Sequence, residues 1–338
     1  MQKVILGKTG LEIGRVGFGG IPIQKVNANV VRQLLISLKE NGGNYIDTAR
    51  GYTVSEEFLG KALKGMRDDF VIATKSMARG YEDMKRDIDI SLNNLQTDYI
   101  DLYQVHNPSL EQLNIVISEN GALQALKEAK EEGKIGHIGL TAHSIEAFKI
   151  ALDMDWIETI MFPFNIVENQ GLDCIRQCKE KDIGFIAMKP LAGGAIEDGT
   201  LALRYIASYP EVTVIIPGMA SLEEVEENTK AINNDGPLSQ EENANILKIK
   251  EALKENFCRR CNYCAPCSVN IQIPSVFLFA GYLQRYDLGE WANDRYNSLE
   301  VKADACIECG ACETRCPYHL PIREMLKKAS ADFKAFNK

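Results

Sequence analysis

Residues 44–63 read NYIDTARGYTVSEEFLGKAL, a stretch that contains a strand, a loop and the start of a helix. The apolar residues near its beginning predict a buried strand that stops at Asp47, and a helix is predicted to begin near Ser55. Tyr52 lies in the loop between them, five residues after the acid. An acid at the carboxyl end of a strand and a tyrosine in the following loop suit a proton-handling site. Tyr52 becomes a general acid only where a nearby cation, itself held by an anion, loosens its proton.

The same alternation of strand and helix recurs along most of the chain. A short hairpin is predicted at Lys3–Leu6 and Leu11–Ile13, and strand-like runs then alternate with amphipathic helical runs such as Ala28–Glu40. The predicted strands are Val16–Phe18, Tyr45–Asp47, Phe70–Thr74, Ile100–Val105, Ile135–Leu140, Thr159–Phe164, Gly184–Met188 and Val212–Ile216. Eight strands joined by helical crossovers indicate an α/β protein with a parallel (β/α)8 TIM barrel. An open doubly wound sheet is the alternative, but no GxGxxG follows the first strand.

The composition is that of an ordinary globular protein. Hydrophobic residues make up 45% of the 338 and charged residues 25%, and the formal net charge of −9 argues against nonspecific nucleic-acid binding. No apolar run reaches transmembrane length, and the first ten residues, MQKVILGKTG, lack the apolar core of a signal peptide. We therefore expect a cytoplasmic protein with no nucleic-acid partner and no membrane partner.

Two later strands end on residues that complete the proton-handling site. Lys75 ends FVIATK and His106 lies in DLYQVHNP, so a barrel brings both to the same end as Asp47 and Tyr52. We expect Asp47 to pair with Lys75, and Lys75 to favour tyrosinate character in Tyr52. His106 is expected beside a substrate carbonyl, as a hydrogen-bond donor or proton partner. Each residue alone suits an ordinary barrel end, but one chemistry uses all four together.

With these residues the sequence resembles the aldo/keto reductase family. DTARGYTVSEEFLGKAL is similar to the family's strand-two signature, and ATK and QVHNP are similar to its lysine and histidine motifs. The resemblance spans roughly Val4–Thr229 and matches all four positions of the family's catalytic tetrad. It implies hydride transfer from NADP(H) or NAD(H) to a small-molecule carbonyl substrate, an aldehyde or ketone. Tyr52 would protonate the carbonyl oxygen, with Lys75, Asp47 and His106 in the family's supporting roles.

The resemblance also implies a cofactor-binding surface at the ends of the later strands. MKPLAGG at Met188–Gly194 is similar to the pyrophosphate loop after the seventh strand. IPGMASLEEVEEN at Ile216–Asn228 is similar to the segment after the eighth strand that holds the adenosine half. The implied cofactor contacts are Gly20, Asp47, Thr141, Asn165, Met188, Pro190, Leu191, Gly193, Gly218, Met219, Ser221, Glu227 and Asn228.

Some positions in this surface differ from the family's usual residues. Thr141 and Ala142 stand where Ser-Asn usually grips the nicotinamide amide. Met161 stands where glutamine is usual, and Met188 where an aromatic often stacks on the nicotinamide ring. No arginine follows Pro217–Gly218 at the place where many members hold the 2′-phosphate. The preference for NADP(H) over NAD(H) is therefore expected from the family alone.

Eight of the ten cysteines follow Asn256. This concentration in one region indicates a local site and not a disulfide framework scattered along the chain. Cys258, Cys261, Cys264 and Cys267 run as C-x2-C-x2-C-x2-C; Cys306, Cys309, Cys312 and Cys316 run as C-x2-C-x2-C-x3-C, followed by Pro317. The second run is the bacterial ferredoxin run in full.

The predicted domain organisation has three parts. They are a barrel over residues 1–235, a connecting helix over 236–256 and a small α-helical, ferredoxin-like iron–sulfur domain over 257–338.

The ferredoxin run predicts two 4Fe–4S clusters with crossed ligands, because three of its cysteines bind one cluster and the fourth binds the neighbour. One cluster is expected on Cys258, Cys261, Cys264 and Cys316, and the other on Cys306, Cys309, Cys312 and Cys267. The first run has a shorter last spacing and Ser268 in place of proline, which leaves the place of Cys267 open. Two four-cysteine zinc sites are the alternative, although zinc sites usually use separated pairs of cysteines.

Hydride transfer does not need these clusters. It moves two electrons together, whereas a cluster normally moves one, and no flavin motif is present. The clusters either fold a tail with little core of its own, or serve a redox partner protein or an unrecognised flavin. We favour the redox role, since ferredoxin-type loops tune the reduction potential through hydrogen bonds to sulfur. Two other functions stay open: a nicotinamide-binding redox sensor or regulatory protein, and an electron-transfer protein coupled to an external partner.

Overall fold

The computed structural model describes residues 3–234, 236–254 and 256–337, and the chain divides into two compact units. The first unit comprises Met1–Asn165, Asn169–Pro190 and Asp198–Leu238. The second comprises Ile166–Glu168, Leu191–Glu197 and Ser239–Lys338. Two short segments after barrel strands therefore group with the C-terminal part of the chain. The limits of the predicted parts at residues 1, 235 and 338 lie outside the described residues.

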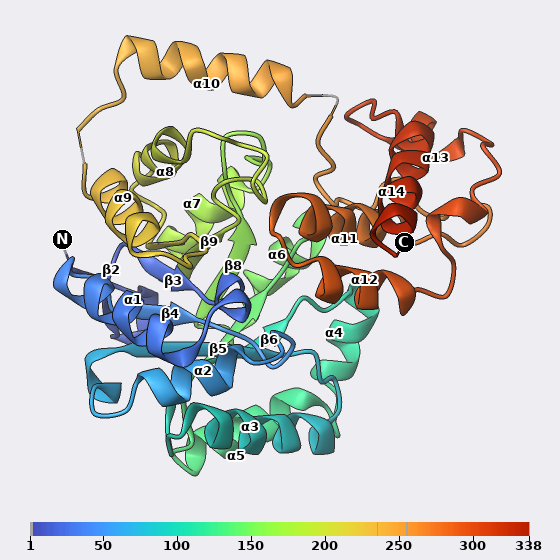
Figure 1. Cartoon of the computed structure of the whole chain (residues 1–338). Coiled ribbons are helices and arrows are strands. Elements are labelled where there is room, and N and C mark those ends of the chain that lie inside the picture. The colour runs from blue at the N-terminus through green and yellow to red at the C-terminus, as the bar shows by residue number, and fades with distance from the viewer. Residues whose placement is uncertain (1–2, 235, 255, 338) are drawn as a thin grey trace. The chain divides into compact units, whose positions relative to one another are not determined.

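The first unit contains the parallel (β/α)8 barrel that the sequence predicts (Figure 1). Its strands are β3 (Gly17–Gly19), β4 (Tyr45–Asp47), β5 (Val71–Ser76), β6 (Ile100–His106), β7 (Ile135–Thr141), β8 (Thr159–Pro163), β9 (Gly184–Met188) and β10 (Val214–Ile216). Each strand pairs with the next along the chain, and two parallel bridges, Val16 to Ile215 and Gly19 to Gly218, join the last strand to the first. The carboxyl ends of the strands therefore meet at one end of the barrel.

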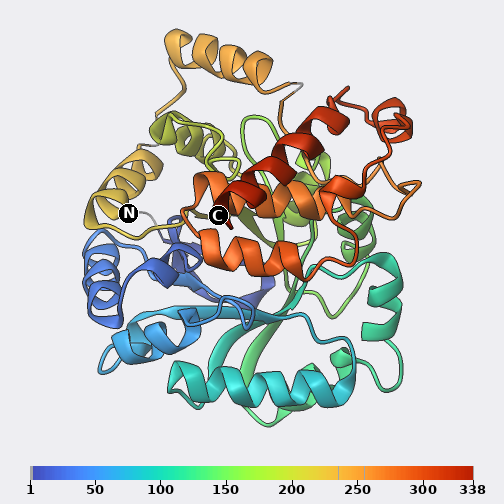
Figure 2. The same ribbon diagram turned by 45° about the vertical axis from the view of Figure 1, so that its right-hand side comes forward.

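Helices follow the strands and ring the barrel (Figure 2). They are α1 (Ala28–Glu40), α2 (Ser55–Ala62), α3 (Tyr81–Leu95), α4 (Leu110–Val116), α5 (Ala122–Glu131), α6 (Ile145–Ala151), α7 (Leu172–Glu180), α8 (Gly199–Ala207) and α9 (Leu222–Asn233). Local side chains define where several of them begin. Asn27 accepts hydrogen bonds from two backbone N–H groups of α1, and Ser109 and Ser221 form capping boxes at α4 and α9.

An antiparallel hairpin, β1 (Lys3–Ile5) with β2 (Glu12–Gly14), precedes the barrel as predicted. Leu6 and Ile13 of this hairpin are fully buried and pack in one cluster with barrel-strand residues such as Tyr45. Side chains from the strands fill the interior of such a barrel, so the strand ends rest on a packed core and not on a channel.

The second unit is α-helical. Its helices are α10 (Gln240–Ala252), α11 (Ile273–Arg285), α12 (Gly289–Asn297), α13 (Ala311–Arg315) and α14 (Ile322–Phe336). Helices α11, α12 and α14, drawn in orange to red in Figure 1, share a small core in which the rings of Tyr296 and Phe333 stack with centroids 3.9 Å apart. Within the predicted connecting part, residues 236–256, the structure has α10, which ends at Ala252. Within the described residues, no helix has the length and apolar character needed to cross a membrane.

A buried carboxylate ties helix α2 to its neighbours in the first unit. Glu56 is only 1% exposed, and it accepts hydrogen bonds from Thr74 Oγ1 at 2.7 Å and Ser91 Oγ at 2.8 Å. Nη1 of Arg50 donates a third, charge-assisted bond at 3.0 Å. Because a buried charge is tolerated only when it is paired and hydrogen-bonded, this network holds α2, β5 and the loop before α2 in one arrangement.

We expect Glu56→Ala to lower the free energy of unfolding by about 3 kcal/mol, because it leaves Arg50 and two hydroxyl groups without their common acceptor. Glu57→Ala is the matched control, since Glu57 is exposed in the same turn of α2. The control should cost less than about 1 kcal/mol. Urea unfolding followed by circular dichroism measures both, and equal losses would show that the Glu56 network contributes nothing specific.

Candidate active site

The structure places the four predicted proton-handling residues together at the carboxyl end of the barrel. Asp47 is the last residue of β4, Lys75 the next to last of β5 and His106 the last of β6. Nζ of Lys75 lies 2.6 Å from Oδ2 of Asp47 and 4.9 Å from the centroid of the Tyr52 ring. The rings of Tyr52 and His106 meet edge to face with centroids 6.3 Å apart. A cation, its counterion, a phenol and an imidazole thus share one corner of the barrel.

The ion pair between Asp47 and Lys75 is almost completely enclosed. Asp47 is 3% exposed and Lys75 is 2% exposed. Nζ of Lys75 also donates to the carbonyl oxygen of Thr48 at 2.8 Å, and Nε2 of Gln104 donates to Oδ1 of Asp47 at 3.4 Å. Burial raises the pKa of the Asp47 carboxyl and lowers the pKa of the Lys75 ammonium, while the attraction between them opposes both shifts. Asp47 is therefore the group that keeps a cation beside the Tyr52 ring.

Sequence reasoning did not single out two residues that position this site. Gln104 contacts Asp47 from β6, and it precedes His106 by two residues. The period of two in a strand puts both on one face, so a signal for Gln104 was present. The backbone N–H of Arg50 donates to the carbonyl oxygen of Lys75 at 3.0 Å and ties the loop that carries Tyr52 to β5. No pattern in the sequence marks that contact.

A half-buried arginine braces the end of β6. Nη2 of Arg79 donates to the carbonyl oxygen of His106 at 2.8 Å, and its Nε donates to Oε1 of Gln112 at 3.2 Å. Burial lowers the pKa of Arg79 to about 10, which still leaves the guanidinium charged at neutral pH. The loop after β5 is thereby fixed against the strand that carries His106.

The residues predicted to contact the cofactor follow the carboxyl ends of the strands. Thr141 ends β7, Met188 ends β9, and the fully buried Asn165 donates from Nδ2 to the carbonyl oxygen of Lys189 at 2.9 Å. The backbone N–H of Gly20, directly after β3, donates to the carbonyl oxygen of Asp47 at 2.8 Å. Pro190 follows β9, Gly218, Met219 and Ser221 lie between β10 and α9, and Glu227 and Asn228 lie within α9.

Leu191 and Gly193, the other two predicted contacts, lie in the segment Leu191–Glu197 of the second unit. This segment contains three consecutive small residues in left-handed conformation, with φ of 50° at Ala192, 67° at Gly193 and 77° at Gly194. Small side chains and turned peptide groups are what a backbone cradle for phosphate requires. Residues 192–194 have both features that such a cradle requires.

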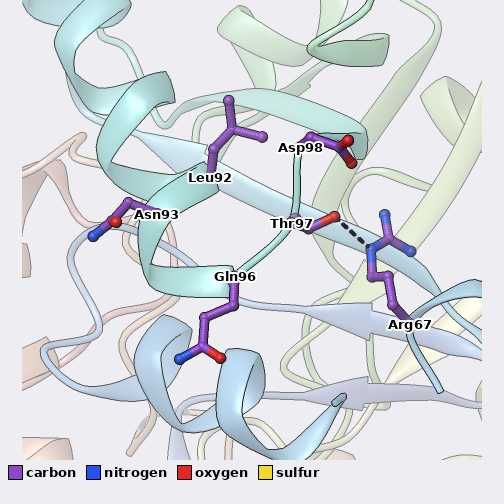
Figure 3. A pocket seen from close by; sticks show the side chains of 6 residues that line it. All are labelled: Arg67, Leu92, Asn93, Gln96, Thr97 and Asp98. Carbon is purple, nitrogen blue, oxygen red and sulfur yellow. Dashed lines mark hydrogen bonds between the residues drawn. The ribbon is translucent and has the colours of Figure 1, made fainter. Parts of the chain in front are cut away.

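A surface hollow of the first unit lies elsewhere (Figure 3). Its lining residues are Arg67, Leu92, Asn93, Gln96, Thr97 and Asp98. Nε of Arg67 donates to Oγ1 of Thr97 at 3.3 Å, and its Nη2 pairs with Asp101 at 2.7 Å. Arg67 precedes β5 and Thr97 precedes β6, so the hollow is at the amino ends of these strands. Barrel enzymes place their chemistry at the opposite end, and we assign this hollow no catalytic role.

The two cysteine runs of the second unit repeat one backbone conformation. In each run, the second and fourth residues after the first cysteine are left-handed. They are Arg260 and Asn262, with φ of 57° and 66°, and Glu308 and Gly310, with φ of 57° and 76°. Only one of these four residues is a glycine. A shared requirement of the loop, and not a shared residue type, therefore accounts for the conformation.

The repeat extends beyond the last cysteine of each run. Asn270 and His319 are both left-handed, and each lies three residues after a last cysteine, Cys267 or Cys316. Their backbone N–H groups donate to the carbonyl oxygens of those cysteines at 3.0 and 3.1 Å. Helices α11 and α14 then begin at the same offset from each turn. Cys267 thus occupies the same structural position as Cys316, despite its shorter spacing and the absence of a following proline.

Cysteines of both runs meet in the core of the second unit. Cys264, Cys312 and Cys316 are buried in one hydrophobic cluster. Oγ of Ser268 lies 3.3 Å from Sγ of Cys309, which links the end of the first run to the second. None of the ten cysteines, all of which lie in the described part of the chain, forms a disulfide. Within residues 3–234, 236–254 and 256–337 no group of Cys, His, Asp or Glu side chains is arranged to bind a single metal ion. Thiolates in this number and order suit iron–sulfur clusters.

Two family models match the chain, one for each part. The model of the aldo/keto reductase family matches residues 11–201 and 197–251, which include every strand of the barrel. The model of a 4Fe-4S dicluster domain matches residues 257–321, which include all eight C-terminal cysteines. The first match covers more than half of the chain, and the second assigns a 4Fe–4S domain to its C-terminal part.

Individual proteins agree with the first match. L-galactose dehydrogenase of Arabidopsis thaliana is 30% identical, and the alignment covers 74% of this chain and 94% of that protein. A holo aldo-keto reductase from Bacillus halodurans is 27% identical with a TM-score of 0.64, over 74% of this chain and 96% of that one. An aldo-keto reductase from Klebsiella pneumoniae in complex with NADPH is 25% identical with the same TM-score, over 74% and 95% of the two chains.

The buried ion pair can be tested by a double-mutant cycle. Asp47→Asn is expected to cost about 3 kcal/mol in the free energy of unfolding, because Lys75 stays buried without its counterion. Combining it with Lys75→Met removes both charges at similar volume and should restore more than half of the loss. Asp69→Asn breaks the exposed pair with Lys39 and should cost less than about 1 kcal/mol. If the losses in unfolding free energy of Asp47→Asn and Lys75→Met simply add in the double variant, the two side chains are not a coupled pair.

Proposed function

The chain belongs to the aldo/keto reductase family, and on that premise we propose that it reduces the carbonyl group of an aldehyde or ketone to an alcohol. The observation that carries the proposal is the convergence of Asp47, Lys75, Tyr52 and His106 at one end of the barrel. In this proposal a bound reduced nicotinamide supplies the hydride to the carbonyl carbon. The protein's own task is then to deliver one proton to the carbonyl oxygen and to hold the substrate.

Tyr52 is the proposed proton donor. The Lys75 ammonium, 4.9 Å from the Tyr52 ring centroid, favours the phenolate that remains once the proton has left. Asp47 keeps that ammonium in place, and the surrounding burial strengthens each of these charge interactions. Proton transfer from a positioned side chain contributes typically about 10²- to 10⁴-fold to a rate.

His106 is proposed to orient the substrate. Its ring stands edge to face with the Tyr52 ring, and Arg79 fixes the main chain that carries it. An imidazole in this place can donate a hydrogen bond to the same carbonyl oxygen that receives the Tyr52 proton. The two donors then polarise the carbonyl bond and define which face receives hydride.

We propose NADP(H) as the cofactor, with NAD(H) as the alternative that a direct comparison decides. A similar structure from Klebsiella pneumoniae holds NADPH. Thr141, Asn165 and Met188 would hold the nicotinamide end, and the small, left-handed segment around Gly193 would hold the pyrophosphate. Glu227 and Asn228 of α9 would contact the adenosine half.

Tyr52→Phe is expected to lower kcat for aldehyde reduction about 10²- to 10⁴-fold and to leave the Kd of NADPH unchanged, because it removes the hydroxyl that donates the proton and no cofactor contact. Tyr99→Phe is the control, since Tyr99 lies at the amino end of β6 and should retain full activity. Turnover of an aldehyde and ketone panel with NADPH and NADH gives kcat, and fluorescence titration gives Kd. Tight cofactor binding with no turnover of any carbonyl would favour a redox sensor instead.

We further propose that the eight C-terminal cysteines hold two 4Fe–4S clusters. Cys258, Cys261, Cys264 and Cys316 would hold one, and Cys306, Cys309, Cys312 and Cys267 the other. The repeated backbone conformation supports two equivalent cluster loops, and the approach of Ser268 to Cys309 supports a crossed fourth ligand.

Paired substitutions test the crossed arrangement. Cys258→Ala with Cys316→Ala should damage one cluster and leave about four irons per chain, whereas Cys258→Ala with Cys267→Ala should damage both. An uncrossed arrangement predicts the reverse pattern. Iron content and the visible band of anaerobically purified protein, which bleaches on reduction, are the measurements. Colourless protein that contains zinc in place of iron would reject the clusters altogether.

A further inference from the structure

The second unit contains an ion pair that joins a cysteine loop to the short segment Ile166–Glu168. Glu168, at 0% exposed, pairs with Nη2 of Arg260, whose side chain is 11% exposed. Arg260 lies between Cys258 and Cys261 in the first run, and its Nη1 also donates to the carbonyl oxygen of Cys258 at 3.2 Å. Glu168 ends the segment Ile166–Glu168, which follows β8. A buried charge pair of this kind forms only when both loops are ordered.

A neighbouring arginine strengthens the same junction. Nε of Arg259 donates to the carbonyl oxygen of Val167 at 3.1 Å, and its Nη1 donates to that of Phe257 at 3.2 Å. The Arg259 guanidinium lies over the ring of Tyr318 at 4.0 Å from the centroid. Tyr318 follows the second cysteine run by two residues, so both runs support the contact with the segment after β8.

Helix α11 makes a second junction, with the segment after β9. Nε of Arg285 donates to the carbonyl oxygen of Gly193 at 2.7 Å. A Cβ atom at Gly193 would lie 3.4 Å from the hydroxyl oxygen of Tyr286, and one at Gly194 would lie 3.3 Å from Cβ of Arg285. Helix α11 therefore supports the left-handed stretch that is proposed to cradle pyrophosphate.

We propose that Arg260 and Arg285 are positioning residues through which the cluster on the first cysteine run controls affinity for the nicotinamide cofactor. This inference rests on the proposed function. The segment held by Arg260 continues directly from Asn165, and the segment held by Arg285 continues from Pro190, both proposed cofactor contacts. Ligation of the cluster orders the loop that carries Arg260, and loss of the cluster frees it. The cofactor then binds a loop that it must first order, at a cost in affinity.

Linkage makes this coupling reciprocal. If the intact cluster raises the affinity for NADPH by some factor, NADPH stabilises the intact cluster by the same factor. If iron leaves through the loosened loop, bound NADPH should also slow its release to a chelator, because it lowers the population of the loosened form. This effect is independent of turnover, and a purely electron-transferring tail would not produce it.

The first experiment measures the Kd of NADPH for anaerobically purified holoprotein by fluorescence. Arg285→Ala and Arg260→Gln should each raise the Kd of NADPH about tenfold. Arg285→Lys retains a hydrogen-bond donor and should raise this Kd less. Gln284→Ala is the matched control, because Gln284 neighbours Arg285 on α11 but bonds to Asp332 and not to the loop. Iron content is determined for every variant, so that a raised Kd is compared at equal cluster loading.

The second experiment follows iron release to a chelator with and without NADPH. Saturating NADPH should slow release in the wild type and in Gln284→Ala about tenfold, and Arg285→Ala should lose most of that protection. Unchanged Kd and unchanged protection in Arg285→Ala would overturn the coupling while leaving carbonyl reduction intact. Wild-type holoprotein that binds neither NADPH nor NADH would instead overturn the proposed function, and the coupling with it.

Discussion

The buried ion pair between Asp47 and Lys75 is the interaction on which the rest of the site depends. Two charges this deep in a barrel are tolerated because each also has a hydrogen bond besides the ion pair. Lys75 donates to the Thr48 carbonyl oxygen, and Asp47 accepts from Gln104. Both charged residues come from strands, whose positions are set by pairing with neighbours, and not from mobile loops. The only tetrad member on a loop is Tyr52, and that loop is tied to β5 through Arg50. Paired strands and one tied loop therefore hold the four predicted proton-handling side chains together without help from a substrate.

Much of this site could be predicted because barrel topology converts sequence position into spatial position. Once the strands ending at Asp47, Lys75 and His106 are recognised, their carboxyl ends must meet. Strand limits were less accurate. β5 continues to Ser76, past the predicted Thr74, because polar residues still pair with β6 where the apolar pattern has stopped. β10 begins at Val214, not Val212: the Thr213 N–H still donates to the Phe185 carbonyl oxygen, but the Phe185 N–H donates to the Thr213 hydroxyl, and the regular ladder starts one residue later.

The parts that sequence reasoning missed are contacts between distant residues of unremarkable type. Glu168 and Arg260 are 92 positions apart, and no sequence motif predicts that they pair. The conformational repeat of the cysteine loops is hidden for a different reason. Arg260 and Glu308 share a left-handed φ although their side chains have opposite charge, so no residue pattern reveals the match. Backbone conformation here follows from what the loop must enclose, and only coordinates show it.

The composition of the second unit from three separate stretches affects how the protein matures. Two of those stretches, Ile166–Glu168 and Leu191–Glu197, leave the ribosome long before the first cysteine run does. Most barrel strands can pair as they emerge, but Glu168 has to wait for Arg260, which is synthesised later, in a loop that the proposed cluster would order. A nascent or iron-starved chain would then have paired barrel strands while the pairing of Glu168 with Arg260 is still missing. Supply of iron and sulfide, and not the speed of barrel folding, would then set how quickly newly made protein becomes resistant to proteolysis.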